Sequence, residues 1–227
     1  MRSNPLRLHV STLFGAIALT SGFLVSCSAS AGKNLAESSP ESKMEMNHDM
    51  KKGGMNHSMN MNLGPADEYY DLRFIDGMVP HHEGAVVMAQ EVLKKSKRPE
   101  LLELAKGIIK AQETEIVMMK TWRKTWYPKV DAVPMAWHSE MKHMMPMPAE
   151  QMKSMRMDMN LGKADDTFDL RFINAMIPHH EGALDMAKDA IGKSKRPEMK
   201  KEAQDILSSQ AAEIKQMKQW RKDWFNQ

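Results

Sequence analysis

Residues 71–89 read DLRFIDGMVPHHEGAVVMA, and residues 169–187 read DLRFINAMIPHHEGALDMA. The two stretches are copies that lie 98 residues apart, and the similarity extends outward from both. KSKRPE at residues 95–100 returns at 193–198, WRKTW at 122–126 returns as WRKDW at 220–224, and MNLG at 61–64 returns at 159–162. The chain therefore contains a duplicated unit, and both copies predict the same local fold.

Each repeat is expected to form a helical hairpin. The first helical part runs from about Asp67 to Lys95, and Pro80 breaks it, kinks it or begins a new helix there. The second helix runs from about Arg98 to Trp126 and carries apolar side chains at helical spacings of three or four. Because an amphipathic hairpin must bury its apolar stripe, we predict an all-α, antiparallel four-helix bundle built from the two hairpins. The pattern leaves open whether the halves share one core.

Two segments outside the repeats are rich in methionine and histidine. The chain holds 24 methionines and 9 histidines, and many of them lie in residues 32–66 and 128–164. Segments with so few branched or aromatic residues bury little core, so we expect both to be flexible. Their candidate metal ligands are Met44, Met46, His48, Met50, Met55, His57, Met59 and Met61 in the first segment, and His138, Met141, His143, Met144, Met145 and Met147 in the second.

Residues 1–31 are interpreted as an export signal, which divides the chain into 1–31, 32–66, repeat 67–127, linker 128–164 and repeat 165–227. Arg2 and Arg7 precede a short apolar run, and residues 29–31 form an A-x-A cleavage site. LVSC at residues 24–27 also resembles a bacterial lipobox, which would attach a lipid anchor at Cys27. Either route predicts a periplasmic or secreted bacterial protein. No later segment is apolar enough to span a membrane.

Charge and cysteine content exclude other classes. Without Arg2 and Arg7 the 32 basic residues become 30 against 29 acidic ones, which gives no basic surface for nucleic acid. The one cysteine is removed or lipidated, so the folded part has no thiol and no disulfide. An inward Glu-x-x-His pair, a C-x-x-C-H haem motif and a His-x-Cys pair are all missing, so we expect no enzyme.

The sharpest motif is M-x-PHHEGA-x-x-M, at residues 78–88 and again at 176–186. Its candidate ligands are Met78, His81, His82 and Met88, and then Met176, His179, His180 and Met186. Thioether sulfur together with imidazole nitrogen suits Cu(I) and Ag(I). The alternative is that the histidines cap a helix and the methionines fill a core, as methionine often does.

The second helix of each hairpin offers further contacts to the histidines. Met119 and Met217 are candidate ligands that face them across the hairpin, and Glu115 and Glu213 lie one turn earlier. We expect Glu115 to accept a hydrogen bond from an imidazole rather than to bind a metal. Asp71 and Arg73 are expected to form an ion pair.

The pattern FI-x-x-M-x-PHHEGA-x-x-MA, at residues 74–89 and 172–187, resembles the domain-of-unknown-function 305 family. The resemblance covers both repeats and implies a ferritin-like helical bundle. Two such repeats with Met/His-rich flanks imply copper binding and protection against excess copper. On the family motif, the implied ligands are the eight methionines and histidines of the two motifs.

Taken with the residues, this predicts a non-enzymatic copper buffer or carrier that contributes to copper resistance. The expected ion is Cu(I), with Ag(I) as a mimic and weaker Cu(II) binding at histidines of the flexible segments. Because a ligating imidazole must be neutral, we expect binding to weaken as the pH falls through about 6. Two alternatives remain open: a structural or oxidant-scavenging methionine-rich protein, and a partner that delivers copper to an exported or thylakoid copper protein.

Overall fold

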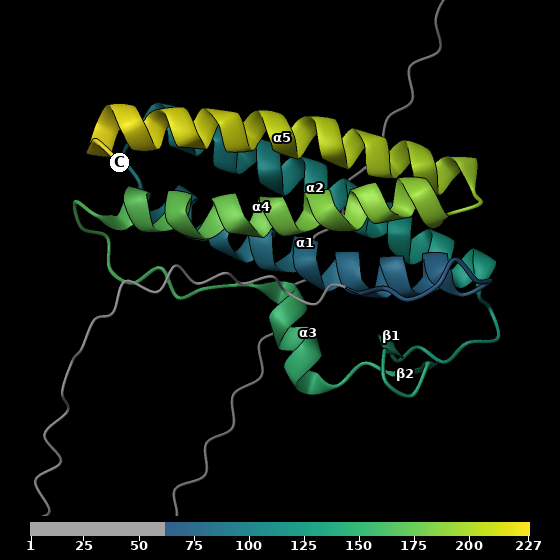
Figure 1. The fold of residues 1–227 in the computed structure, drawn as a ribbon. Coiled ribbons are helices and arrows are strands. Elements are labelled where there is room, and N and C mark those ends of the chain that lie inside the picture. The colour runs from purple at the N-terminus through teal and green to yellow at the C-terminus, as the bar shows by residue number, and fades with distance from the viewer. Residues whose placement is uncertain (1–61) are drawn as a thin grey trace, which may run out of the picture. The chain divides into compact units, whose positions relative to one another are not determined.

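The computed structural model describes residues 62–227, so residues 1–31, predicted to be an export signal, and residues 32–61 of the first Met/His-rich segment lie outside this part. Four long helices dominate it (Figure 1). They are α1 (Tyr70–Lys95), α2 (Pro99–Trp126), α4 (Phe168–Lys193) and α5 (Pro197–Phe225). The all-α prediction of two duplicated helical hairpins is therefore confirmed.

Each hairpin turns at the same sequence, and the reason is local. The KSKRPE copies place Pro99 and Pro197 at the start of α2 and α5, where a missing backbone N–H costs nothing. Ser96 and Ser194, in extended conformation, end α1 and α4. Inside α1 the helix continues through Pro80, so this proline does not begin a new helix.

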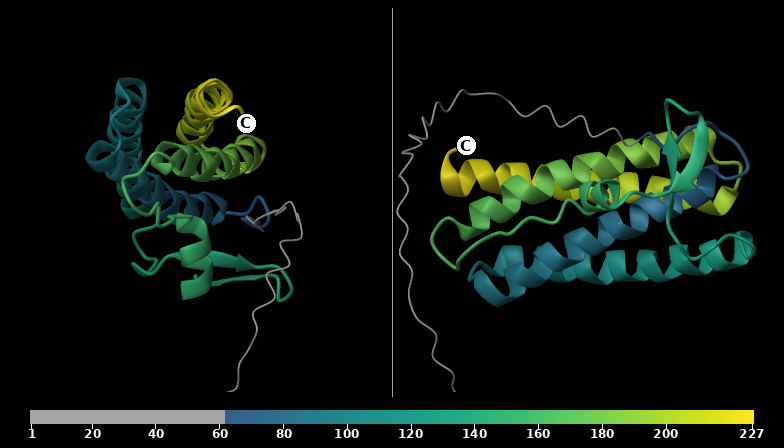
Figure 2. Two further views of the ribbon diagram at one scale, coloured as in Figure 1. Left: turned by 90° about the vertical axis from the view of Figure 1, so that its left-hand side faces the viewer. Right: turned by 90° about the horizontal axis from the view of Figure 1, so that it is seen from below.

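The two repeats share their core. One buried cluster combines Ala85, Met88 and Ile108 of the first repeat with Phe172, Met176 and Met217 of the second. The other combines Phe74, Met78 and Met119 with Met186, Met199 and Ile206. α1 and α4 lie side by side at the centre (Figures 1 and 2), and every core cluster crosses their interface. The repeat pattern left open whether the halves share one core, and the structure shows that they do.

Polar contacts also cross between the repeats, and here one expectation was wrong. Asp71 does not pair with Arg73. Its carboxylate lies 3.3 Å from Arg196 of the second repeat, while Arg73 pairs with Asp67 at 2.9 Å. The duplicate contact joins Arg98 to Asp169 at 3.2 Å.

The linker between the repeats differs from the expected flexible segment. It contains a two-stranded antiparallel hairpin, β1 (Met135–His138) and β2 (His143–Pro146), followed by the short helix α3 (Ala149–Arg156). Hairpin and helix lie on the side of the α1–α4 pair away from α2 and α5 (Figure 2). The prolines limit the sheet to two short strands, and buried Ala136 and Met155 attach the linker to the bundle. Within residues 62–227 no helix is long and apolar enough to cross a membrane.

Candidate metal centre

The four motif histidines meet at the interface of α1 and α4. His81, His82, His179 and His180 are all fully buried, and the ring centroids of His81 and His179 lie 3.8 Å apart. Adjacent positions on a helix point about 100° apart. One histidine of each doublet therefore faces the other repeat, and the second faces its own hairpin partner.

The outer histidine of each doublet binds a glutamate on the second helix of its hairpin. The Nε2–H of His82 donates to Glu115 Oε2 at 2.6 Å, and that of His180 donates to Glu213 Oε2 at 2.6 Å. The expected role of Glu115 as an imidazole partner is confirmed. A carboxylate at one ring nitrogen fixes the tautomer and makes the other nitrogen a better ligand.

The remaining ring nitrogens are left without partners. The Nδ1 atoms of all four histidines are buried and make no hydrogen bond, whereas Nε2 of His179 bonds the Arg156 carbonyl at 3.2 Å. His81 has no partner at either nitrogen. Buried polar atoms are rarely left unpaired, because each one costs free energy. Five nitrogens of these four buried imidazoles are therefore without a partner and available to a ligand.

Burial also keeps the central pair neutral. Desolvation, followed by the neighbouring His179, lowers the pKa of His81 well below its usual value. Desolvation, followed by the neighbouring His180, lowers the pKa of His179 to about 3. Both imidazoles therefore have free lone pairs at neutral pH, the form in which they can bind a metal.

Methionines of the motif line the core on either side of the histidines. Met78, Met119 and Met186 belong to one cluster, and Met88, Met176 and Met217 belong to the other. Each trio takes two methionines from one repeat and the third from the other. Met78 and Met176 lie four residues, one helical turn, before His82 and His180. The predicted methionine ligands of the bundle are thus all buried, in two clusters that each join both repeats, although core packing alone would also bury them.

The candidate ligands of the linker lie on a different element. His138 faces His143 across the strand pair with ring centroids 5.9 Å apart, and Met141 at the turn is 61% exposed. Met144, Met145 and Met147 are half-buried. The eight candidates from Met44 to Met61 lie outside the described residues.

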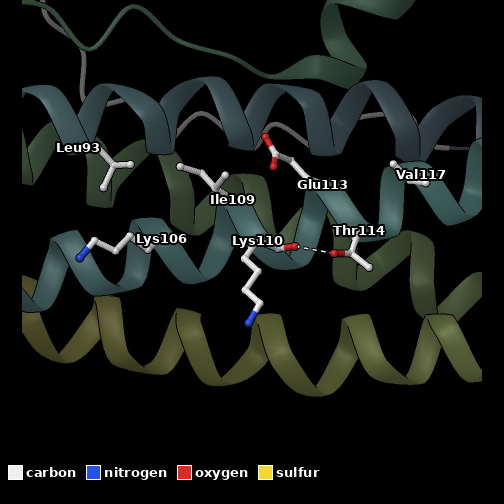
Figure 3. Close-up of a pocket in the computed structure, with 7 residues that line it drawn as sticks. All are labelled: Leu93, Lys106, Ile109, Lys110, Glu113, Thr114 and Val117. Carbon is white, nitrogen blue, oxygen red and sulfur yellow. Dashed lines mark hydrogen bonds between the residues drawn. The ribbon is translucent and has the colours of Figure 1, made fainter. Parts of the chain in front are cut away.

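The structure holds no ready site for a harder ion. Within residues 62–227 no three side chains from His, Cys, Asp and Glu are grouped closely enough to hold a metal. A shallow surface hollow of about 600 Å³ opens on the outer face of the α1–α2 hairpin between Leu93 and Val117 (Figure 3). It is lined by lysine, aliphatic, threonine and glutamate side chains, with no soft ligand. A site with three or more protein ligands in residues 62–227 would therefore have to include groups other than the side chains of His, Cys, Asp and Glu.

Three residues near the site were not predicted from the sequence. Glu202 on α5 is buried, and desolvation followed by the charge of Glu115 raises its pKa to about 7. Leu104 occupies the matching position of the first repeat, so the mismatch between copies could have drawn attention to it. Met155 and the Arg156 carbonyl on α3 gave no such signal.

The chain belongs to the family described as domain of unknown function 305, whose model matches residues 71–221. Solved structures of CopM are similar to it: the Cu(I)-bound form is 40% identical, covers 68% of this chain and 97% of its own, and has a TM-score of 0.54. The apo form is 41% identical over 68% and 98%, with a TM-score of 0.55.

More distant relatives agree on the fold. A putative secreted protein of the same family from Streptomyces coelicolor is 26% identical, covers 67% of this chain and 90% of its own, and has a TM-score of 0.51. Among curated proteins, uncharacterized protein L153 of Acanthamoeba polyphaga mimivirus is 43% identical over 49 residues. That match covers 22% of this chain and only 32% of the viral protein.

Proposed function

We propose that this protein binds Cu(I), and Ag(I) as its mimic, in the periplasm or another space outside the cytoplasm, and buffers or carries copper without catalysing a reaction. The observation that carries the proposal is the burial of four histidines with unpaired Nδ1 atoms in a bundle whose core also buries six candidate methionines. CopM, the similar protein, has been solved with Cu(I), with Ag and with Cu(II) bound. By withholding copper from other sites, the protein would contribute to copper resistance.

The ligand chemistry favours the monovalent ion. Thioether sulfur is soft and neutral, and Cu(I) accepts two or three such ligands together with imidazole. Zn(II) in proteins usually takes four ligands from thiolate, imidazole and carboxylate, and the described residues do not group three of these side chains at one point. Cu(II) prefers several nitrogen or oxygen ligands in a tetragonal array. We therefore propose weak Cu(II) binding only, at exposed histidines such as His143.

The direct test is a titration of the reduced apo-protein with Cu(I) against a competing chromophoric chelator, repeated with Ag(I), Cu(II) and Zn(II). We expect Cu(I) and Ag(I) to be bound much more tightly than the divalent ions. Binding of Zn(II) as tight as that of Cu(I) would remove the proposal. Weak binding of all four ions would favour the alternative of a structural or oxidant-scavenging methionine-rich protein.

A second candidate, delivery of copper to an exported or thylakoid copper protein, uses the same ligands. Neutral thioethers exchange an ion between sites more readily than thiolates do, which favours a carrier over permanent storage. Transfer of Cu(I) to a purified acceptor, faster than release to the chelator alone, would distinguish a carrier from a buffer.

A further inference from the structure

We infer that α3 is a removable cap over the His81–His179 pair, that the carbonyl of Arg156 positions His179 for metal binding, and that an ion reaches the pair when α3 moves away. The inference deepens the proposed function and rests on it for the part that concerns copper. It begins from burial. Both imidazoles are fully inaccessible, so some part of the protein must move before an ion can reach them.

The contact that closes the site is made by the C-terminal turn of α3. Carbonyls of a last helical turn lack partners in their own helix, and Arg156 O instead accepts a hydrogen bond from His179 Nε2–H at 3.2 Å. This bond keeps the proton on Nε2 and leaves Nδ1 as the free ligand atom. His81 has no equivalent partner. The linker thus makes the two central histidines unequal, although the repeats that carry them are copies.

Gly84 of α1 is what allows α3 to come so close. A Cβ at this position would lie 1.8 Å from Arg156 O and 2.8 Å from its carbonyl carbon, so any other residue would displace the α3 backbone. Gly84 is an ordinary helical position inside α1, where alanine would be the better helix former. Close packing of the α3 backbone gives this glycine a physical role in the structure.

Among the long helices, α3 packs mainly against α1. Met155 is buried among side chains that include Met78, and the half-buried Arg156 guanidinium lies 3.3 Å from Glu83 of α1. Its other ion pair, with Asp158, stays within the linker. The helix has eight residues. A short helix that packs on one neighbour, through one buried side chain, one hydrogen bond and one half-buried ion pair, opens at a lower free energy than four mutually packed long helices do. Of the elements around the histidine pair, α3 is therefore the one that can detach while the bundle remains folded.

The test compares full-length wild type with Gly84→Ala and with the matched control Gly107→Ala. Gly107 is also inside a long helix, and a Cβ there meets nothing within 4 Å. Met155→Ala serves as a second route, because it loosens α3 without changing α1. None of these variants removes a proposed ligand.

Two measurements on the apo-protein test the cap itself. In Gly84→Ala we expect faster hydrogen exchange across residues 149–156 and loss of the slowly exchanging His179 Nε2–H signal in histidine-labelled NMR spectra. Gly107→Ala should match wild type in both. If α3 stays as protected in Gly84→Ala as in wild type, the cap does not exist as described. This result does not depend on whether the protein binds copper.

The third measurement is the rate of Cu(I) uptake from a chelator complex by stopped flow, using the kinetic phase that His179→Gln abolishes. We expect this phase to be several-fold faster in Gly84→Ala and Met155→Ala than in Gly107→Ala. Equal rates, with α3 shown to be loosened by exchange, would overturn the gating role. If His179→Gln abolishes no phase of Cu(I) uptake, copper does not bind at this pair. The proposed function then fails at this site, and the gating role fails with it.

Discussion

At the scale of single residues, the orientation of each imidazole decides what the site can bind. Carboxylates on Glu115 and Glu213 and the Arg156 carbonyl occupy one nitrogen of three histidines and leave the other free. Burial then prevents the central pair from taking up protons. An imidazole that is already neutral, oriented and unpaired can bind a metal with little rearrangement, so the free-energy cost of reorganising the site is small.

Burial of the central histidines predicts a specific pH dependence of apo-protein stability. His179 has a folded pKa of about 3, against about 6.5 when unfolded. Between these values the unfolded state binds a proton that the folded state does not, so stability is full above pH 6.5 and falls as the pH is lowered toward 3. The slope approaches about 1.4 kcal/mol per pH unit for each such histidine.

The pH dependence of stability can be measured by chemical denaturation of wild type and His179→Gln between pH 7 and pH 5. The variant lacks the proton uptake on unfolding, so its stability relative to wild type should rise as the pH falls. A constant difference between the two proteins across this range would mean that His179 is not buried in its neutral form.

The same shift revises the pH at which metal binding weakens. The sequence alone predicted that metal binding weakens as the pH falls through about 6, where an ordinary imidazole takes up a proton. With the pKa of His179 at about 3, protons compete for its lone pair in the folded protein only under much more acid conditions. We expect the His81–His179 pair to retain its Cu(I) affinity at pH 5, as measured with a chelator whose own protonation is corrected for. A tenfold loss of affinity between pH 7 and pH 5.5 would contradict this.

At the scale of elements, the two second helices of the hairpins differ where the copies diverge. α2 carries Leu104 at a buried position, and α5 carries Glu202 at the matching one. The Oε1 of Glu202 has no hydrogen-bond partner, and burial raises its pKa to about 7. Folding at alkaline pH therefore requires either a buried charge near Glu115 or the uptake of a proton.

Replacing Glu202 with leucine should stabilise the apo-protein at pH 8. The raised folded pKa means that the native state binds the extra proton, so the penalty is absent below about pH 4.5 and complete above about pH 7. We expect Glu202→Leu to add roughly 1–3 kcal/mol at pH 8 and clearly less at pH 5, as measured by urea denaturation. Glu103→Leu, at an exposed position of α2, is the control and should change little at either pH. Destabilisation at pH 8 by Glu202→Leu would show that the carboxylate has a partner.

The sequence predicted those elements in which apolar residues recur at a regular spacing. The long helices and their turns followed from apolar spacing and from the KSKRPE copies, because these signals are local. The linker could not be predicted in this way. Its scarcity of branched and aromatic residues predicted a flexible segment, and its order depends on the packing of Ala136 and Met155 against the bundle. The position of Arg156 O against Gly84 likewise arises only once the fold is formed.

At the candidate site, the sequence singled out the residues more readily than their contacts. The doubled motif identified the four histidines, because their spacing from the flanking methionines recurs in both copies. It did not reveal which repeat supplies which methionine, since each buried trio joins residues from both halves. The pairing of Asp71 with Arg196 escaped prediction for the same reason.

At the scale of the whole molecule, the two copies form one folded unit with a shared core. The guanidinium of Arg196 lies 4.4 Å from the Trp126 ring, and that of Arg98 lies 4.4 Å from the Trp224 ring, so each end of the bundle is joined by a contact between repeats. The core clusters cross the same interface. Neither hairpin alone can bury its apolar face.

Two consequences can be measured by circular dichroism. The apo-protein should be mostly helical and should unfold in one transition, because its core does not depend on a metal. The isolated second repeat, residues 165–227, should instead show little helix as a monomer or should dimerise, which sedimentation would detect. A stable, helical, monomeric single repeat would show that the halves are independent domains, and little helix in the full apo-protein would show that folding requires the metal.

The central claim is that methionine sulfur and histidine nitrogen in the bundle core hold Cu(I), and a pair of variants tests it most directly. In one, leucine replaces Met78, Met88, Met176 and Met186, which keeps apolar volume and removes sulfur. In the other, glutamine replaces His81, His82, His179 and His180. Competitive Cu(I) titration of the folded apo-proteins should show that both variants lose the tightest binding found in wild type, by at least tenfold in affinity. If the leucine variant stays folded and binds Cu(I) as tightly as wild type, those methionines serve only to fill the core and the account of the site is wrong.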